Sequence, residues 1–82
     1  MKISTKGRYA LRILADIAEH GVEKNVPIRE IAERQGFSDK YLEGIVSRLS
    51  SAGLVKSGRG KYGGYRLVKL PAEYNVYEIL YA

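Results

Sequence analysis

The sequence predicts a mainly α-helical fold with a small β-hairpin, and three observations lead to that fold class. Three segments before Gly53 place apolar residues at the three- and four-residue spacing of one helix face. Two short strand-like runs then flank a glycine-rich loop. The chain has 82 residues, which is enough for one domain with one modest core. We therefore expect residues 1–82 to form a single domain.

The first helix is expected to begin at Ser4 or Thr5, since either side chain can cap it. It is expected to end at Gly21 in the left-handed conformation. Its apolar stripe consists of Ala10, Ile13, Leu14, Ile17 and Ala18. Three cations lie near its beginning: Lys6, Arg8 and Arg12. The helix dipole disfavours positive charge there, so an anionic partner near this end would offset the mismatch.

A second helix is predicted over residues 28–35, and Gly36 should stop it. Its apolar face consists of Ile28, Ile31 and Ala32. Ser38 is a good N-cap for a third helix, which Gly53 closes. The buried stripe of the third helix consists of Leu42, Ile45, Val46 and Leu49.

Residues 54–57 and 65–68 are strand-like, and the loop from Gly58 to Gly64 between them predicts a β-hairpin. Pro71 is expected to end the second strand. Asn75 followed by Glu78 is a capping signal for a short last helix. Two helices joined through a glycine turn, a third helix and a hairpin, in this order, are typical of a winged helix-turn-helix domain. A helical pair with a purely structural role has the same local pattern.

Positive charge is concentrated in the hairpin. The formal net charge is +5, and five basic residues lie in this segment without an acidic one: Lys56, Arg59, Lys61, Arg66 and Lys69. The other basic residues equal the acidic ones in number, so the surplus suggests a directed anion-binding surface. A basic loop that only improves solubility is the alternative interpretation.

Few features favour catalysis or a cofactor. The chain has no cysteine, so it can hold no disulfide or cysteine-ligated metal, and an iron–sulfur cluster is possible only in a longer parent chain. The sole histidine, His20, needs no role beyond the end of a helix, and four acidic residues fit solvated helix faces: Asp16, Glu19, Glu30 and Glu33. Gly58 to Gly63 spells a dinucleotide-binding motif but leads into a strand instead of a helix. We therefore expect no enzyme.

Charged residues also interrupt every apolar run, so no membrane span or signal peptide is expected and the chain is predicted to be cytoplasmic.

Several segments resemble the bacterial Rrf-two type regulators, a family that includes the iron–sulfur cluster regulator, the nitric-oxide-sensing repressor and the cysteine-metabolism repressor. The matching segments are residues 1–10, 31–36, 52–55 and 59–65, with Ser38 and residues 41–43. The resemblance implies a winged helix-turn-helix repressor that binds a partly palindromic operator as a homodimer. It also implies that the dimerisation and sensor region lies after residue 82.

The resemblance places the helix over residues 38–51 in the major groove and the wing over 58–64 on phosphates or the minor groove. Candidate DNA-binding residues are Ser38, Lys40, Tyr41, Glu43, Gly44, Arg48, Arg59, Gly60, Lys61 and Tyr62. Weaker candidates for phosphate contact are Lys2, Thr5, Lys6 and Arg8. Among these residues, the carboxylate of Glu43 can accept from cytosine N4, and Lys40 and Arg48 can neutralise phosphates.

Other roles remain open for some of these residues. Glu43 can instead pair with a cation on the helix surface, Tyr41 can belong to the core, and Ser38 can serve as a cap alone. Gly44 departs from the family, where a longer polar residue such as Gln is frequent. Either fewer side chains then read the sequence, or the helix backbone comes closer to DNA. Two other functions are a winged-helix module that binds a protein partner and non-specific binding to nucleic acid or an anionic membrane.

Overall fold

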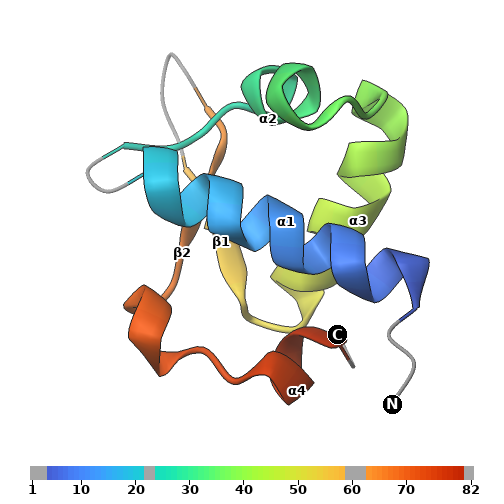
Figure 1. Ribbon diagram of the computed structural model, residues 1–82. Helices are drawn as coiled ribbons and strands as arrows, with labels where there is room; N and C mark the ends of the chain where they lie inside the picture. Colours follow the sequence, from blue (N-terminus) through green and yellow to red (C-terminus); the bar gives the residue numbers. More distant parts are fainter. Residues whose placement is uncertain (1–3, 22–23, 59–62, 81–82) are drawn as a thin grey trace.

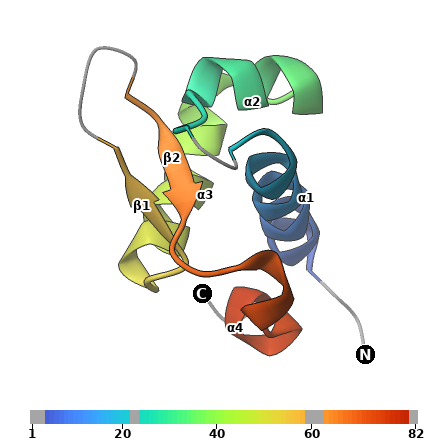
Figure 2. The ribbon, with the colours of Figure 1, turned by 90° about the vertical axis from the view of Figure 1, so that its left-hand side faces the viewer.

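The computed structural model describes residues 4–21, 24–58 and 63–80, and its elements follow the predicted order. Helix α1 spans Thr5–His20, α2 spans Ile28–Gln35 and α3 spans Asp39–Ser51. Strands β1 (Val55–Ser57) and β2 (Tyr65–Leu67) form the hairpin, and a 3-10 turn, η1 (Pro71–Glu73), leads to the short α4 (Val76–Leu80). In both Figure 1 and Figure 2, α2 and α4 lie on opposite sides of α1. The mainly helical winged helix-turn-helix prediction is confirmed.

The core is built around α1, which contacts α2, α3, α4 and β2. All four residues of the predicted α3 stripe are buried, and so are Ile31 and Ala32 of α2. The side chains with almost no exposed surface come from α1, α2, α3 and the segment before α2: Ile13, Ile17, Val26, Ile31, Leu42, Val46 and Leu49. The apolar stripes that predicted the helices are thus the surfaces on which the helices meet.

Local caps set the helix boundaries. The Ser4 hydroxyl accepts a hydrogen bond from the Gly7 amide at 3.0 Å, and that of Ser38 accepts one from the Tyr41 amide at 3.1 Å. Gly36 has φ 74°, the left-handed conformation that ends α2.

Gly21 ends α1 as expected, but the left-handed conformation expected for it was wrong, because its φ is −114°. A glycine fits this position because there is no room for a side chain: a Cβ would lie 2.8 Å from the Ile17 carbonyl oxygen and 2.9 Å from Val26 Cγ2.

The hairpin is shorter than predicted. Lys56 pairs with Arg66, and Val55 pairs with Leu67 next to it. Tyr65 also exchanges two backbone hydrogen bonds with Val26, at 2.8 and 2.9 Å, which fastens the hairpin to the segment before α2. The second strand ends at Leu67, and Pro71 begins η1 instead of ending the strand as expected.

The chain after the hairpin is held by side chains. The Tyr74 hydroxyl donates to the Leu54 carbonyl oxygen at 2.6 Å and accepts from the Val68 amide at 3.0 Å. The predicted capping of α4 is confirmed. The Glu78 carboxylate accepts a hydrogen bond from the backbone N–H of Asn75 at 3.0 Å, and the side-chain oxygen of Asn75 accepts one from the backbone N–H of Tyr77 at 2.8 Å. In the residues that the structure describes, no helix is long and apolar enough to cross a membrane.

Candidate nucleic-acid interface

The solvent side of α3 carries most of the candidate DNA-binding residues that the structure describes. Lys40, Tyr41, Glu43, Gly44 and Arg48 are all exposed on this helix. Ser38, at its N-cap, is exposed too, and its hydroxyl keeps a proton to donate because the cap bond uses it only as an acceptor. One face of α3 thus combines hydrogen-bond donors, cations and a carboxylate.

Glu43 forms no ion pair with another described residue. Among the described residues, no cation takes up the alternative in which this carboxylate pairs on the helix surface. A carboxylate without such a partner can accept a hydrogen bond from outside, and cytosine N4 is a donor of the right kind in the major groove.

Tyr41 belongs to an aromatic cluster at the N-terminal end of α3. Its ring centroid lies 6.0 Å from that of Tyr9 and 5.8 Å from that of Phe37, while the Tyr9 and Phe37 centroids are 4.7 Å apart. The residue is nevertheless 40% exposed. Tyr41 therefore packs on α1 and on the turn between α2 and α3 and also reaches the surface, so it is not a core residue.

Arg12 has a partner within the chain and needs no external anion. Its guanidinium carbon lies 5.6 Å from the Tyr9 ring centroid and 5.2 Å from that of Phe37, the distance of a cation–π contact. The same group donates to the side chain of Gln35 at 3.2 Å and to its carbonyl oxygen at 3.1 Å. The Arg12 guanidinium therefore lies at the C-terminal end of α2, where the helix dipole favours positive charge.

Asp16 does not lie on a solvated helix face, which corrects the expectation. It is 3% exposed and accepts two hydrogen bonds from Arg34, at 2.7 and 2.9 Å, and one from the Gln35 amide at 2.9 Å. Burial by itself raises the pKa of this carboxyl, but the hydrogen bonds from Arg34 and Gln35 and the charge of Arg34 outweigh it, so the pKa lies below its ordinary value. The other three acidic residues, Glu19, Glu30 and Glu33, are exposed as expected.

The buried carboxylate was hard to recognise from the sequence. Asp16 stands three residues after Ile13 and directly before Ile17, so it borders the apolar stripe and can face either solvent or the core. Arg34 and Gln35 lie on another helix, and only the packing of α1 against α2 brings them to it.

A hollow of about 410 Å³ lies between the start of α1 and the exposed face of α3. Its lining consists of Lys6, Lys40, Tyr41, Gly44, Ile45 and Arg48. The structure thus brings Lys6, a weaker candidate, next to the candidate residues of α3. Thr5 and Arg8 are exposed on α1 but do not line this hollow.

The five other candidates, Lys2, Arg59, Gly60, Lys61 and Tyr62, lie outside the described residues.

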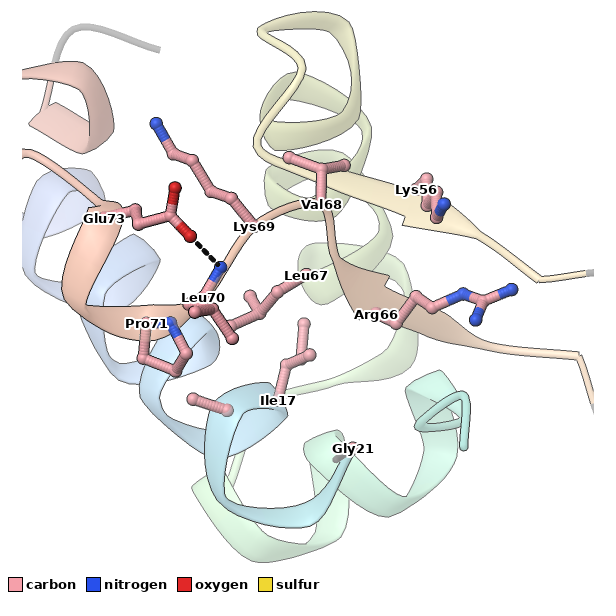
Figure 3. Close-up of a pocket in the computed structure, with 11 residues that line it drawn as sticks. Ile17, Gly21, Lys56, Arg66, Leu67, Val68, Lys69, Leu70, Pro71 and Glu73 are labelled. Carbon is pink, nitrogen blue, oxygen red and sulfur yellow. Dashed lines mark hydrogen bonds between the residues drawn. The ribbon is translucent and has the colours of Figure 1, made fainter. Parts of the chain in front are cut away.

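The described part of the hairpin carries less free positive charge than its composition suggests. Lys69 is paired with Glu78, with Nζ 3.0 Å from Oε2. Lys56 and Arg66 are exposed and face each other across the two strands, where like charges repel. Both border a hollow of about 580 Å³ that also reaches Ile17, Gly21 and Leu70 (Figure 3). Lys56 and Arg66 are therefore two neighbouring cations that can bind an anion beside this hollow.

The described residues include no group of three or more His, Cys, Asp or Glu that could hold a metal ion. The whole chain also contains no cysteine. An iron–sulfur cluster, which is usually held by cysteine thiolates, does not fit these residues.

Comparison with known proteins points to one family. Residues 3–82 match the Rrf2 model, described as an iron-dependent transcriptional regulator. The chain is 45% identical over 82 residues to protein rrf2 of Nitratidesulfovibrio vulgaris, covering all of this chain and 55% of that protein. It is 48% identical over 82 residues to the HTH-type transcriptional regulator IscR of Photorhabdus laumondii, covering all of this chain and 50% of that protein. The chain thus spans about half the length of these curated relatives.

A solved structure agrees with this match. IscR of T. potens superimposes with a TM-score of 0.89 and 46% identity, over 99% of this chain and 59% of that one. The family model is described as a transcriptional regulator and IscR of Photorhabdus laumondii is named as one, which supports the expectation that the chain is not an enzyme. The chain belongs to the Rrf2 family of transcriptional regulators.

Proposed function

We propose that this chain is the sequence-specific DNA-binding part of a transcriptional repressor. The observation that carries the proposal is the exposed face of α3, where Glu43 lies without an ion-pair partner among the described residues and Lys40 and Arg48 lie on the same side of the helix. Cations grip phosphates without regard to sequence, whereas a carboxylate gains from DNA only where it meets a base donor.

In this proposal α3 enters the major groove. Glu43 accepts from cytosine N4, while Lys40 and Arg48 bind phosphates and Ser38 and Tyr41 donate to phosphate oxygens. The wing, residues 58–64, grips phosphates or the minor groove, with Arg59, Gly60, Lys61 and Tyr62 as its contacts. Lys2, Thr5, Lys6 and Arg8 supply further phosphate contacts from the start of the chain.

The intact protein is proposed to be a homodimer on a partly palindromic operator in the cytoplasm. This follows from family membership and from a fold in which one copy carries one recognition helix, because two-fold symmetric sites are read by two copies. Dimerisation and sensing would use residues other than these 82. An iron–sulfur cluster, if the parent protein has one, would need thiolates outside these residues as well, since they contain no cysteine.

The test begins with selection of a duplex by the chain from a random-sequence DNA pool. Its affinity is then measured by fluorescence anisotropy for the selected duplex and for a scrambled version, over a series of salt concentrations. We expect a steep salt dependence and at least about a 1,000-fold preference for the selected duplex. Equal affinity for the two duplexes would indicate non-specific binding, and no binding at low salt would favour a protein partner.

Single substitutions distinguish residues that recognise bases from residues that bind phosphates. We expect Glu43→Ala to bind base-pair variants of the selected duplex more equally, with about 1–3 kcal/mol less discrimination at one position. Arg48→Ala should weaken binding to all the duplexes alike and lower the salt slope by about one. Glu33→Ala, which removes an exposed carboxylate from α2, is the matched control and should change neither property. Unchanged discrimination in Glu43→Ala would remove Glu43 from the base-reading residues.

A further inference from the structure

We propose that the hollow over Gly44 seats a deoxyribose–phosphate segment of one DNA strand, and that Gly44 sets how deeply α3 lies in the groove. The inference rests on the DNA-binding function proposed above and assigns a specific part of the DNA to a specific part of the site. It also decides between the two interpretations of Gly44 in favour of a closer approach of the helix backbone to DNA.

Nothing within the described protein requires a glycine at this position. Gly44 lies inside α3 and is not among the glycines with a positive φ. A Cβ built on Gly44 would meet nothing within 4 Å, so no neighbour excludes a larger side chain. Glycine inside a helix costs about 1 kcal/mol relative to alanine. A glycine that neither the backbone nor the packing demands is explained by a partner that comes close to the backbone.

The surroundings of Gly44 define the chemistry of that partner. Lys40, Gly44 and Arg48 follow one another at four-residue spacing and therefore lie along one face of α3, and Lys6 of α1 lines the hollow from the other side. These three cations form no ion pair with a described residue. Tyr41 and Ile45 complete the lining of the hollow with apolar surface.

A sugar–phosphate segment fits this combination better than a base edge. Its phosphates carry the negative charge that three cations attract, and its deoxyribose ring can lie on the apolar wall. A base edge is read by hydrogen-bonding side chains, and Gly44 has none to offer. Because Lys6 belongs to α1 and the other two cations to α3, a strand seated here would fix the position of both helices on the duplex.

The experiment compares three side chains at this position. Gly44→Ala should raise the melting temperature of the free chain, because alanine favours a helix more than glycine does. The same methyl group should weaken binding to the selected duplex, though less than a larger side chain does, because it stands where the strand approaches the helix backbone. Gly44→Leu should fill the hollow and weaken binding to both the selected and the scrambled duplexes, at least about tenfold for the selected one. It should also lower the salt slope by about one to two, since phosphates are held away from the cations. Ser50→Leu adds the same side chain at an exposed position of α3 outside the hollow and should have little effect.

Phosphate ethylation interference identifies the DNA atoms directly. The phosphates whose ethylation blocks wild-type binding should include one or two that no longer matter in Gly44→Leu, and Lys6→Ala should lose the same signals. Wild-type affinity and slope in Gly44→Leu would overturn the proposal, as would a changed base preference with an unchanged slope. If wild type itself does not prefer the selected duplex, the proposed function fails first, and this result is distinct from a failure confined to the Gly44 variants.

Discussion

Asp16 holds two helices together through one buried side chain. Its carboxylate receives both hydrogen bonds of the Arg34 guanidinium and one from Gln35, and Gln35 in turn receives two from Arg12. Arg12 lies against the aromatic cluster that includes Tyr41. A continuous set of contacts therefore runs from the middle of α1 to the N-terminal end of α3, and it positions the face that carries Glu43.

Asp16→Asn tests this connection at the residue scale. The substitution keeps the size of the side chain but removes the negative charge, and an amide cannot accept both Arg34 bonds. We expect the free energy of unfolding at pH 7 to fall by about 1.5–3 kcal/mol, the usual contribution of hydrogen bonds to charged groups. Urea denaturation measures it, with Glu19→Gln as the control because Glu19 is an exposed carboxylate on the same helix. An equal loss in both variants would contradict a specific role for Asp16.

At the scale of elements, the sequence predicts helix ends set by neighbouring residues better than it predicts contacts between separate elements. The starts of α1 and α3 and the end of α2 were predicted correctly, because Ser4, Ser38 and Gly36 act on backbone groups within a few residues. Gly21 was explained by the wrong cause, since its neighbour Val26 comes close only after folding.

The candidate site shows the same division. The cations and Glu43 of α3 follow from one helix and a family resemblance, so the sequence alone could single them out. The hollow at Gly44 also needs Lys6, whose position against α3 depends on the packing of α1. Likewise, Lys69 counted as free charge until the fold placed it beside Glu78.

The Tyr74 hydroxyl connects the hairpin to the rest of the fold. It joins the Leu54 carbonyl, at the junction of α3 and β1, to the Val68 amide directly after β2. Tyr74→Phe removes both hydrogen bonds and leaves the carbonyl of the buried Leu54 without this donor. We expect a loss of about 1–3 kcal/mol in the free energy of unfolding. Tyr41→Phe removes an exposed hydroxyl without a hydrogen bond to a described residue and should cost much less, so equal losses in thermal denaturation would contradict this role.

At the scale of the whole molecule, the fold redistributes the net charge of +5. Arg34 forms an ion pair with Asp16, and Lys69 forms one with Glu78. Lys6, Lys40 and Arg48 lie around the hollow at Gly44 and belong to α1 and α3, outside the basic hairpin. The positive surface proposed to meet DNA therefore has a helical part as well as the wing, and only the packing of α1 against α3 shows that the cations of the two helices lie around one hollow.

The same ion pairs predict how the stability of the whole chain responds to acid. The hydrogen bond from the Asn75 amide, followed by that from Lys69, lowers the pKa of Glu78, and the pKa of Asp16 is lowered as well. In the unfolded chain both carboxyls return to ordinary values of about 4, so the unfolded state binds protons first as the pH falls. The stability that these groups contribute is fully present above about pH 5 and is lost as the pH falls through their folded values.

Urea denaturation between about pH 3 and pH 7 measures that loss in wild type and in Asp16→Asn. The free energy of unfolding of wild type should decline below about pH 4.5, and the decline should be shallower in Asp16→Asn because one of the two carboxyls no longer titrates. General charge repulsion at low pH acts on both proteins, so the difference between the two curves isolates the contribution of Asp16. This difference should shrink as the pH falls, and a constant difference across the range would show that the carboxyl of Asp16 has the same pKa in the folded and unfolded states.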